Sequence, residues 1–107
     1  MTGKLVRDRI PEIIRAKGDR PVTRVADSAE FRSRLGDKLV EEAQEARDAE
    51  REHQAEELAD TLEVVYAMAG EIGLTREGLE KIREDKAADR GGFRDRIVWL
   101  GNEEIGE

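Results

Sequence analysis

Two acidic motifs near the middle of the chain contain the residues best suited to chemistry. Glu42 and Glu45 form the first motif, and Glu57 and Asp60 form the second. Residues three apart lie next to each other on one face of a helix, so each motif would present two carboxylates in one direction. A turn near Arg51 that folds two helices antiparallel would place the two motifs at matching heights. Four carboxylates would then face one another across the hairpin.

Such a cluster requires a source of positive charge. Carboxylates about 5 Å apart repel by about 3 kcal/mol per pair where the effective dielectric constant is about 20. Protonation, basic partners or metal ions would offset this repulsion, and hard oxygen ligands suit Mg²⁺ and Mn²⁺. We therefore predict Mg²⁺ as the cofactor, with Mn²⁺ as an alternative. The predicted ligands are Glu42, Glu45, Glu57 and Asp60.

The competing interpretation is that these carboxylates face solvent, because acidic pairs arise often by chance in a chain that is 42% charged. The apolar pattern favours the metal site. Glu42 lies inside a stripe of apolar residues whose spacing is typical of a core-facing helix surface. Carboxylates are rarely buried unless they are paired or coordinated. The stripe consists of Phe31, Leu35, Leu39 and Ala46.

The composition indicates one small domain with a thin core. The chain has 107 residues, of which 37% are apolar and 4% aromatic, so a second copy would help to cover its apolar helices. The net charge of −7 disfavours binding to nucleic-acid polymers or anionic membranes. The absence of cysteine excludes disulfides and thiol chemistry. No apolar run has membrane-spanning length and no signal-peptide pattern is present, so the cytoplasm is the expected location.

The positions of apolar and helix-terminating residues predict an all-α fold around an antiparallel helical hairpin, in one domain over residues 1–107. Helices are expected over about residues 12–17, 28–49, 55–71 and 75–88. Two segments rich in β-branched residues, 20–25 and 96–100, are expected to be strands that pair as a small ribbon. The tail from Gly101 is expected to be mobile.

The second hairpin helix has a wide apolar surface. Val64 and Met68 widen its main stripe, and Glu57 shares their face. This arrangement would place Glu57 beside the core, as the stripe in the first helix does for Glu42. The main stripe consists of Leu58, Leu62, Val65, Ala69 and Ile72.

Basic residues near the N-terminus are a further candidate for contact with the acidic cluster or with a phosphate. They are Lys4, Arg7 and Arg9, just before Pro11. The alternative is that the neighbouring apolar residues dock this segment while the charges face water. Composition alone favours that alternative.

Three sequence blocks resemble the all-α nucleotide pyrophosphohydrolases, a superfamily that includes MazG, the dimeric dUTPases and phosphoribosyl-ATP pyrophosphohydrolase. Glu41-Glu42-Ala-Gln-Glu45 followed by Glu57-Leu-Ala-Asp60 resembles their EExxE…ExxD signature. The opening segment Lys4–Ile14 resembles the start of small MazG-like members. Lys86-Ala-Ala-Asp-Arg90-Gly-Gly-Phe93 resembles their KxxxRGGF ending. Together the blocks extend over almost the whole chain.

The resemblance implies a Mg²⁺-dependent enzyme that hydrolyses a nucleoside triphosphate to a monophosphate and pyrophosphate, and so removes unwanted nucleotides. It implies a homo-oligomer, a dimer or a tetramer. Glu42, Glu45, Glu57 and Asp60 would hold Mg²⁺, and the catalytic residues would be Glu41, Glu42 and Glu45. Substrate phosphates would contact Lys38, Lys86 and Arg90.

Two alternatives remain open. The acidic blocks also resemble phosphoribosyl-ATP pyrophosphohydrolase of histidine biosynthesis. We rank that reading second because the opening segment differs from that enzyme and its usual downstream histidine is absent, with Met68 and its neighbours in that place. The third reading is a non-catalytic helical interaction module that retains the acidic hairpin as part of its fold.

Overall fold

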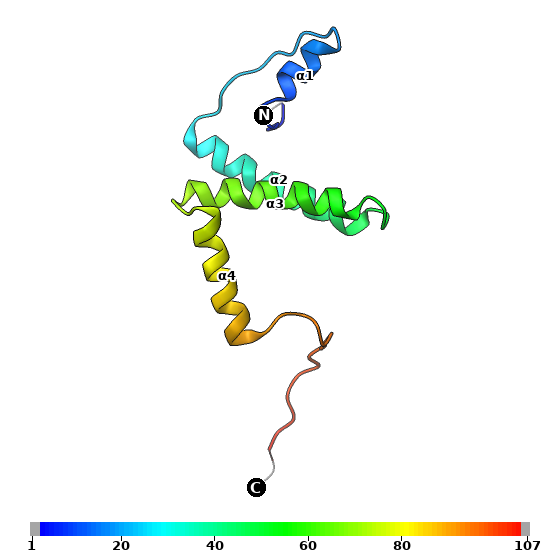
Figure 1. Ribbon diagram of the computed structural model, residues 1–107, viewed down its shortest axis with the longest axis vertical. Helices are drawn as coiled ribbons and strands as arrows, with labels where there is room; N and C mark the ends of the chain where they lie inside the picture. The colour runs from blue at the N-terminus through cyan, green and yellow to red at the C-terminus, as the bar shows by residue number, and fades with distance from the viewer. Residues whose placement is uncertain (1–2, 106–107) are drawn as a thin grey trace.

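A computed structural model describes residues 3–105, which contain four α-helices and no strand (Figure 1). The long helices α2 and α3 run antiparallel as a hairpin, and α4 leaves the end of α3 and points away from it (Figure 1). The all-α prediction is therefore confirmed. The helices are α1 (Ile10–Ala16), α2 (Ser28–Asp48), α3 (Gln54–Glu71) and α4 (Arg76–Arg90).

Local hydrogen bonds explain where the hairpin helices begin and end. The Asp27 side chain caps α2 by accepting a hydrogen bond from the Glu30 N–H at 2.8 Å. The backbone turns at residues 49–53, as expected for a break near Arg51. At the start of α3 the Gln54 side chain donates to the carbonyl of Ala46 at 3.2 Å, which joins the two helices at the turn.

The buried core of the described chain is small and lies between α2 and α3. Its apolar members are Leu35 and Ala46 on α2 and Val64 and Ala69 on α3. Glu42 is buried among them, as the apolar stripe of α2 predicts. The hairpin therefore places one carboxylate inside its own core.

The main apolar stripe predicted for α3 does not all face this core. Leu58 and Leu62 are 57% and 46% exposed, and Ile72 beyond the helix end is 75% exposed. The reason is geometric, because α3 packs on α2 along the edge that contains Val64. The expectation that one broad stripe faces the interior is wrong in this respect, and α3 retains an open apolar face.

The predicted ribbon is also wrong for the described chain. Neither residues 20–25 nor residues 96–100 form a strand, and Val22 and Trp99 are 100% and 76% exposed. A strand needs a neighbouring strand to satisfy its backbone groups, and β-branched composition does not supply one. Both segments are extended connections instead.

The molecule is elongated. Its principal extents are 73 × 34 × 28 Å and its radius of gyration is 19.2 Å, whereas a compact domain of this length would have a radius of gyration of about 13 Å.

The Thr75 side chain caps α4 by accepting a hydrogen bond from the Gly78 N–H at 3.0 Å. Among the described helices, none combines the length and apolar character needed to cross a membrane.

Candidate metal centre

The hairpin brings three of the four predicted ligands together. One carboxylate oxygen from each of Glu42, Glu57 and Asp60 lies within 4.8 Å of the other two. Glu57 and Asp60 are three residues apart on α3 and so share a face, and this face meets α2 at Glu42. Three hard oxygen donors from two rigid helices thus converge on one point.

Burial makes this cluster different from an ordinary acidic surface patch. Glu42 is 8% exposed, and its Oε2 atom is buried without a hydrogen-bond partner. The Oε2 atom of Glu57 is also buried without a hydrogen-bond partner. A buried oxygen without a partner costs about 1–3 kcal/mol, and more when it is charged. These two oxygens fit a cation as their missing partner, and the all-oxygen donor set suits Mg²⁺ or Mn²⁺.

The surroundings oppose ionisation of Glu42. Burial raises its pKa above the ordinary value, and the negative charge of Glu45 raises the pKa further. Lys38 acts in the opposite direction, with its Nζ atom 3.5 Å from Glu42 Oε1. The net direction is upward, so Lys38 offsets only part of the repulsion and desolvation at this carboxylate.

Glu45 and Glu41 lie at the edge of the cluster. Glu45 is exposed and is not one of the three converging residues, although its charge acts on Glu42. Glu41 is exposed and lines a hollow of about 150 Å³ next to Lys38. The hollow lies between α2 and the N-terminal segment, and its lining residues are Gly3, Lys4, Leu5, Arg34, Asp37, Lys38 and Glu41.

Arg7 contacts the cluster, an option that the sequence offered but that composition alone did not favour. Its Nη1 atom donates to Asp60 Oδ1 at 3.2 Å, and its Nη2 atom lies 3.9 Å from Glu63 Oε1. Composition favoured basic side chains in water here, whereas Arg7 reaches a candidate metal ligand 53 residues away. The available signal was a basic segment in a chain of net charge −7, but no local pattern identifies which carboxylate it meets.

Two predicted phosphate contacts are not near the cluster within one chain. Lys86 and Arg90 are exposed residues in the second half of α4. This helix leads away from the hairpin, so its end lies far from the middle of α3 (Figure 1). Of the predicted substrate contacts, only Lys38 adjoins the carboxylates.

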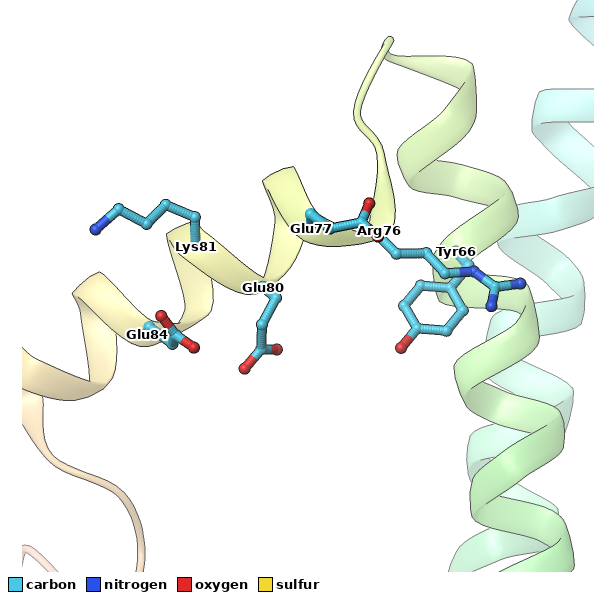
Figure 2. A pocket seen from close by; sticks show the side chains of 6 residues that line it. All are labelled: Tyr66, Arg76, Glu77, Glu80, Lys81 and Glu84. Atoms are coloured by element: carbon cyan, nitrogen blue, oxygen red, sulfur yellow. The ribbon is translucent and has the colours of Figure 1, made fainter.

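A larger hollow lies between α3 and α4 but lacks the reactive groups. It measures about 530 Å³, and the guanidinium of Arg76 lies 4.6 Å from the centre of the Tyr66 ring (Figure 2). The carboxylates along its α4 side would oppose a phosphate, and Glu80 pairs with Arg83 at 2.6 Å. No member of the acidic cluster lines it. Its lining residues are Tyr66, Arg76, Glu77, Glu80, Lys81 and Glu84.

Comparisons with known proteins agree with the resemblance in the motifs. Residues 8–87 match the family model of phosphoribosyl-ATP pyrophosphohydrolase. An uncharacterized protein of Mycolicibacterium smegmatis (strain ATCC 700084 / mc(2)155) is 51% identical over 47 residues, which are 44% of this chain and 48% of that protein. The match thus spans about half the length of that relative. No solved structure matches the chain.

Proposed function

The chain belongs to the phosphoribosyl-ATP pyrophosphohydrolase family, and from this premise we propose that it is a Mg²⁺-dependent nucleoside triphosphate pyrophosphohydrolase. The products would be a nucleoside monophosphate and pyrophosphate, and the role would be removal of unwanted nucleotides. The observation that carries the proposal is the buried Glu42 carboxylate, with an oxygen that lacks a partner, beside Glu57 and Asp60. A purely structural helix face would not require this arrangement.

Each part of the cluster has a proposed role. Glu42, Glu57 and Asp60 would hold the cation, with Glu45 as a fourth ligand from the edge. Bound there, Mg²⁺ would neutralise phosphate oxygens and lower the pKa of a water molecule. Glu41 is exposed beside the hollow and would accept the proton from the attacking water, since it is not among the converging oxygens.

Phosphate recognition is assigned to basic residues on two elements. Lys38 adjoins Glu42 and would contact the phosphate nearest the cation. Lys86 and Arg90 lie on α4, which leads away from the hairpin of the same chain. We therefore propose that they act in a homo-oligomer, in which α4 of one copy lies beside the hairpin of another.

The surface of the chain supports an oligomer. The accessible surface is 9955 Å² for a mass of 12.1 kDa, whereas a compact monomer of this mass exposes about 6,000 Å². The excess is about 4,000 Å² per chain, which exceeds the roughly 1,000–2,500 Å² that one partner usually contributes to an obligate interface. Leu58 and Leu62 on α3 and Ile82 on α4 are exposed apolar residues on helices, which a second copy would cover.

Phosphoribosyl-ATP is the second candidate substrate. The observation in its favour is the family model itself, which carries that name over residues 8–87. The same cluster suits both substrates, because both contain a phosphoanhydride bond next to a nucleoside. The sequence has one histidine, His53, at the turn before α3, and not downstream of the second acidic motif.

A substrate panel tests the proposal directly. The protein with Mg²⁺ would be incubated separately with standard and modified nucleoside triphosphates and with phosphoribosyl-ATP, and pyrophosphate release would be measured. We expect release by the wild type and near-complete loss in a Glu42→Gln/Asp60→Asn double variant, because the converging oxygen donors are lost. Glu56→Gln, an exposed neighbour of Glu57, is the matched control and should retain activity.

The possible results separate the three readings. Fastest hydrolysis of a nucleoside triphosphate would support the proposal, and fastest hydrolysis of phosphoribosyl-ATP would support the second candidate. Absence of release from every nucleotide, with Mg²⁺ affinity unchanged in the double variant, would contradict both and favour a helical interaction module.

A further inference from the structure

Arg7 brings a positive charge to the acidic cluster from outside the hairpin. It belongs to the segment before α1, yet its guanidinium donates to Asp60 at 3.2 Å. The same guanidinium lies 3.9 Å from Glu63, one helical turn further along α3. Arg7 thus lies between one carboxylate that is a candidate metal ligand and one that is not.

The charges around the cluster show why this position matters. In the described chain, two basic side chains adjoin the three converging carboxylates: Lys38 next to Glu42 and Arg7 next to Asp60. A divalent cation would add two further positive charges at the same oxygens. Like charges held this close repel, so binding of the cation favours departure of one basic group.

Arg7 is the basic group that is free to move. The Lys38 side chain is 19% exposed and pairs with Glu42 along its own helix. The Arg7 side chain is 61% exposed and extends from a loop. Exposed ion pairs of this kind contribute at most about 1 kcal/mol, so little is lost when Arg7 leaves Asp60.

We propose that Arg7 serves as the counter-ion of Asp60 in the metal-free protein and gives up this carboxylate when a divalent cation binds. Its charge then rests on Glu63, which it already approaches, and is available to the phosphates of an incoming nucleotide. The inference rests on the proposed function, because it takes Asp60 as a ligand of the cation. In this proposal Arg7 competes with the cation for the Asp60 carboxylate and does not orient Asp60 as a ligand.

The exchange requires movement of a side chain and not release of the segment. Arg34 on α2 donates to the carbonyl of Gly3 at 3.0 Å, which ties the start of the segment to the hairpin. Glu30 in turn accepts a hydrogen bond from Arg34 at 2.7 Å. This anchor does not involve Asp60, so it persists when Arg7 changes partner.

Direct measurement of metal binding tests the inference. Mn²⁺ affinity would be measured at low ionic strength by electron paramagnetic resonance for the wild type and for Arg7→Gln, Arg7→Lys and Arg9→Gln. We expect Arg7→Gln to bind Mn²⁺ roughly three- to tenfold more tightly, because the repulsion between the guanidinium and the cation is lost. This magnitude is that expected for two charges several ångströms apart in water, and the gain should be smaller at high salt. Arg7→Lys retains the charge and should remain near the wild type.

Arg9→Gln is the matched control. Arg9 lies two residues further along the same segment and pairs with Glu12 at 2.7 Å, so its loss should leave Mn²⁺ affinity unchanged. Circular dichroism of every variant would verify that the helices are intact. A second measurement uses Mg²⁺, which should shift the side-chain ¹⁵N signal of Arg7 but not that of Arg9.

The outcomes distinguish failure of the inference from failure of the proposed function. Unchanged or weaker Mn²⁺ binding by Arg7→Gln, with pyrophosphate release by the wild type, would overturn the inference alone. A wild type that binds no divalent cation would overturn the metal centre and the inference together. A gain of the same size in Arg9→Gln would also overturn the inference, because general charge removal would then explain it.

Discussion

At the scale of single residues, Glu42 is where packing and electrostatics conflict. It occupies a core position of α2, its Oε2 atom has no hydrogen-bond partner, and burial raises its pKa. Asp60 is exposed enough to meet Arg7, and Glu45 faces solvent. In the proposed metal centre, Glu42 is therefore the carboxylate that should depend most strongly on the cation. Its replacement should affect metal binding and metal-free stability in opposite directions.

We expect Glu42→Gln to weaken Mn²⁺ binding by more than about tenfold, because one of the converging anionic oxygens is lost. The metal-free variant should be as stable as the wild type or more stable by about 1 kcal/mol, because Lys38 offsets only part of the cost of the buried charge, which the neutral amide removes. Isothermal titration and thermal unfolding measure the two effects. Glu56→Gln should change neither, and a Glu42→Gln variant that is less stable yet binds Mn²⁺ normally would contradict the metal centre.

At the scale of elements, an ion-pair clamp holds the N-terminal part of the chain to the start of α2. Glu30 accepts hydrogen bonds at 2.7 Å from Arg24 in the preceding loop and from Arg34 on its own helix. Arg34 also donates to the carbonyl of Gly3. The clamp thus connects the loop, the helix and the segment that contains Arg7.

The clamp should respond to acid. The hydrogen bonds from Arg24, then from Arg34, lower the pKa of Glu30 from its ordinary value of 4.5 to about 2. A carboxyl whose folded pKa is depressed stabilises the fold above its unfolded pKa and loses that contribution as pH falls through the folded pKa. We therefore expect the stability difference between the wild type and Glu30→Gln to be constant above about pH 5 and to shrink towards pH 2.

Urea unfolding at several pH values measures this difference. Glu80→Gln is the matched control for a pair within one helix, because Glu80 binds Arg83 on α4 and does not connect elements. Protease cleavage in residues 17–26 should increase in Glu30→Gln at neutral pH and not in Glu80→Gln. A wild-type advantage that grows as pH falls below 4.5 would contradict the sign of the linkage.

At the scale of the whole molecule, one chain leaves many large apolar side chains exposed. The core between α2 and α3 contains few buried apolar residues, α4 projects from the hairpin, and the segment after it is exposed. Leu58 and Leu62 lie one turn apart on α3 and form an open apolar face. These features and the excess surface support the proposed homo-oligomer, in which a second copy would pack against α3 and α4.

We expect the wild type to sediment as a dimer or tetramer at micromolar concentration. Leu58→Asp/Leu62→Asp should shift it to smaller species, because two charges would be buried without partners at the interface. Val22→Asp is the control, since Val22 is fully exposed on a loop. Analytical ultracentrifugation measures all three, and a monomeric wild type at these concentrations would contradict the proposed assembly.

Periodicity and termination signals along the sequence were sufficient to predict four helices and the position of Glu42 inside an apolar stripe. Those features depend on neighbours within a few residues, and hydrogen bonds such as the Asp27 and Thr75 caps are local. The turn near Arg51 contains no Gly or Pro and was predicted from the equal spacing of the two acidic motifs about that residue. The convergence of Glu42 with Glu57 and Asp60 also followed, because a short turn fixes which residues of an antiparallel hairpin lie at the same height.

Contacts between residues far apart in the sequence could be seen only in the tertiary structure. Which edge of α3 meets α2 depends on packing, so Leu58 and Leu62 remain exposed although they have the spacing of a core stripe. The contact of Arg7 with Asp60 joins positions 53 residues apart, and many carboxylates were equally available to it. Residues 20–25 and 96–100 have strand-like composition, but a strand exists only where a second strand satisfies its backbone.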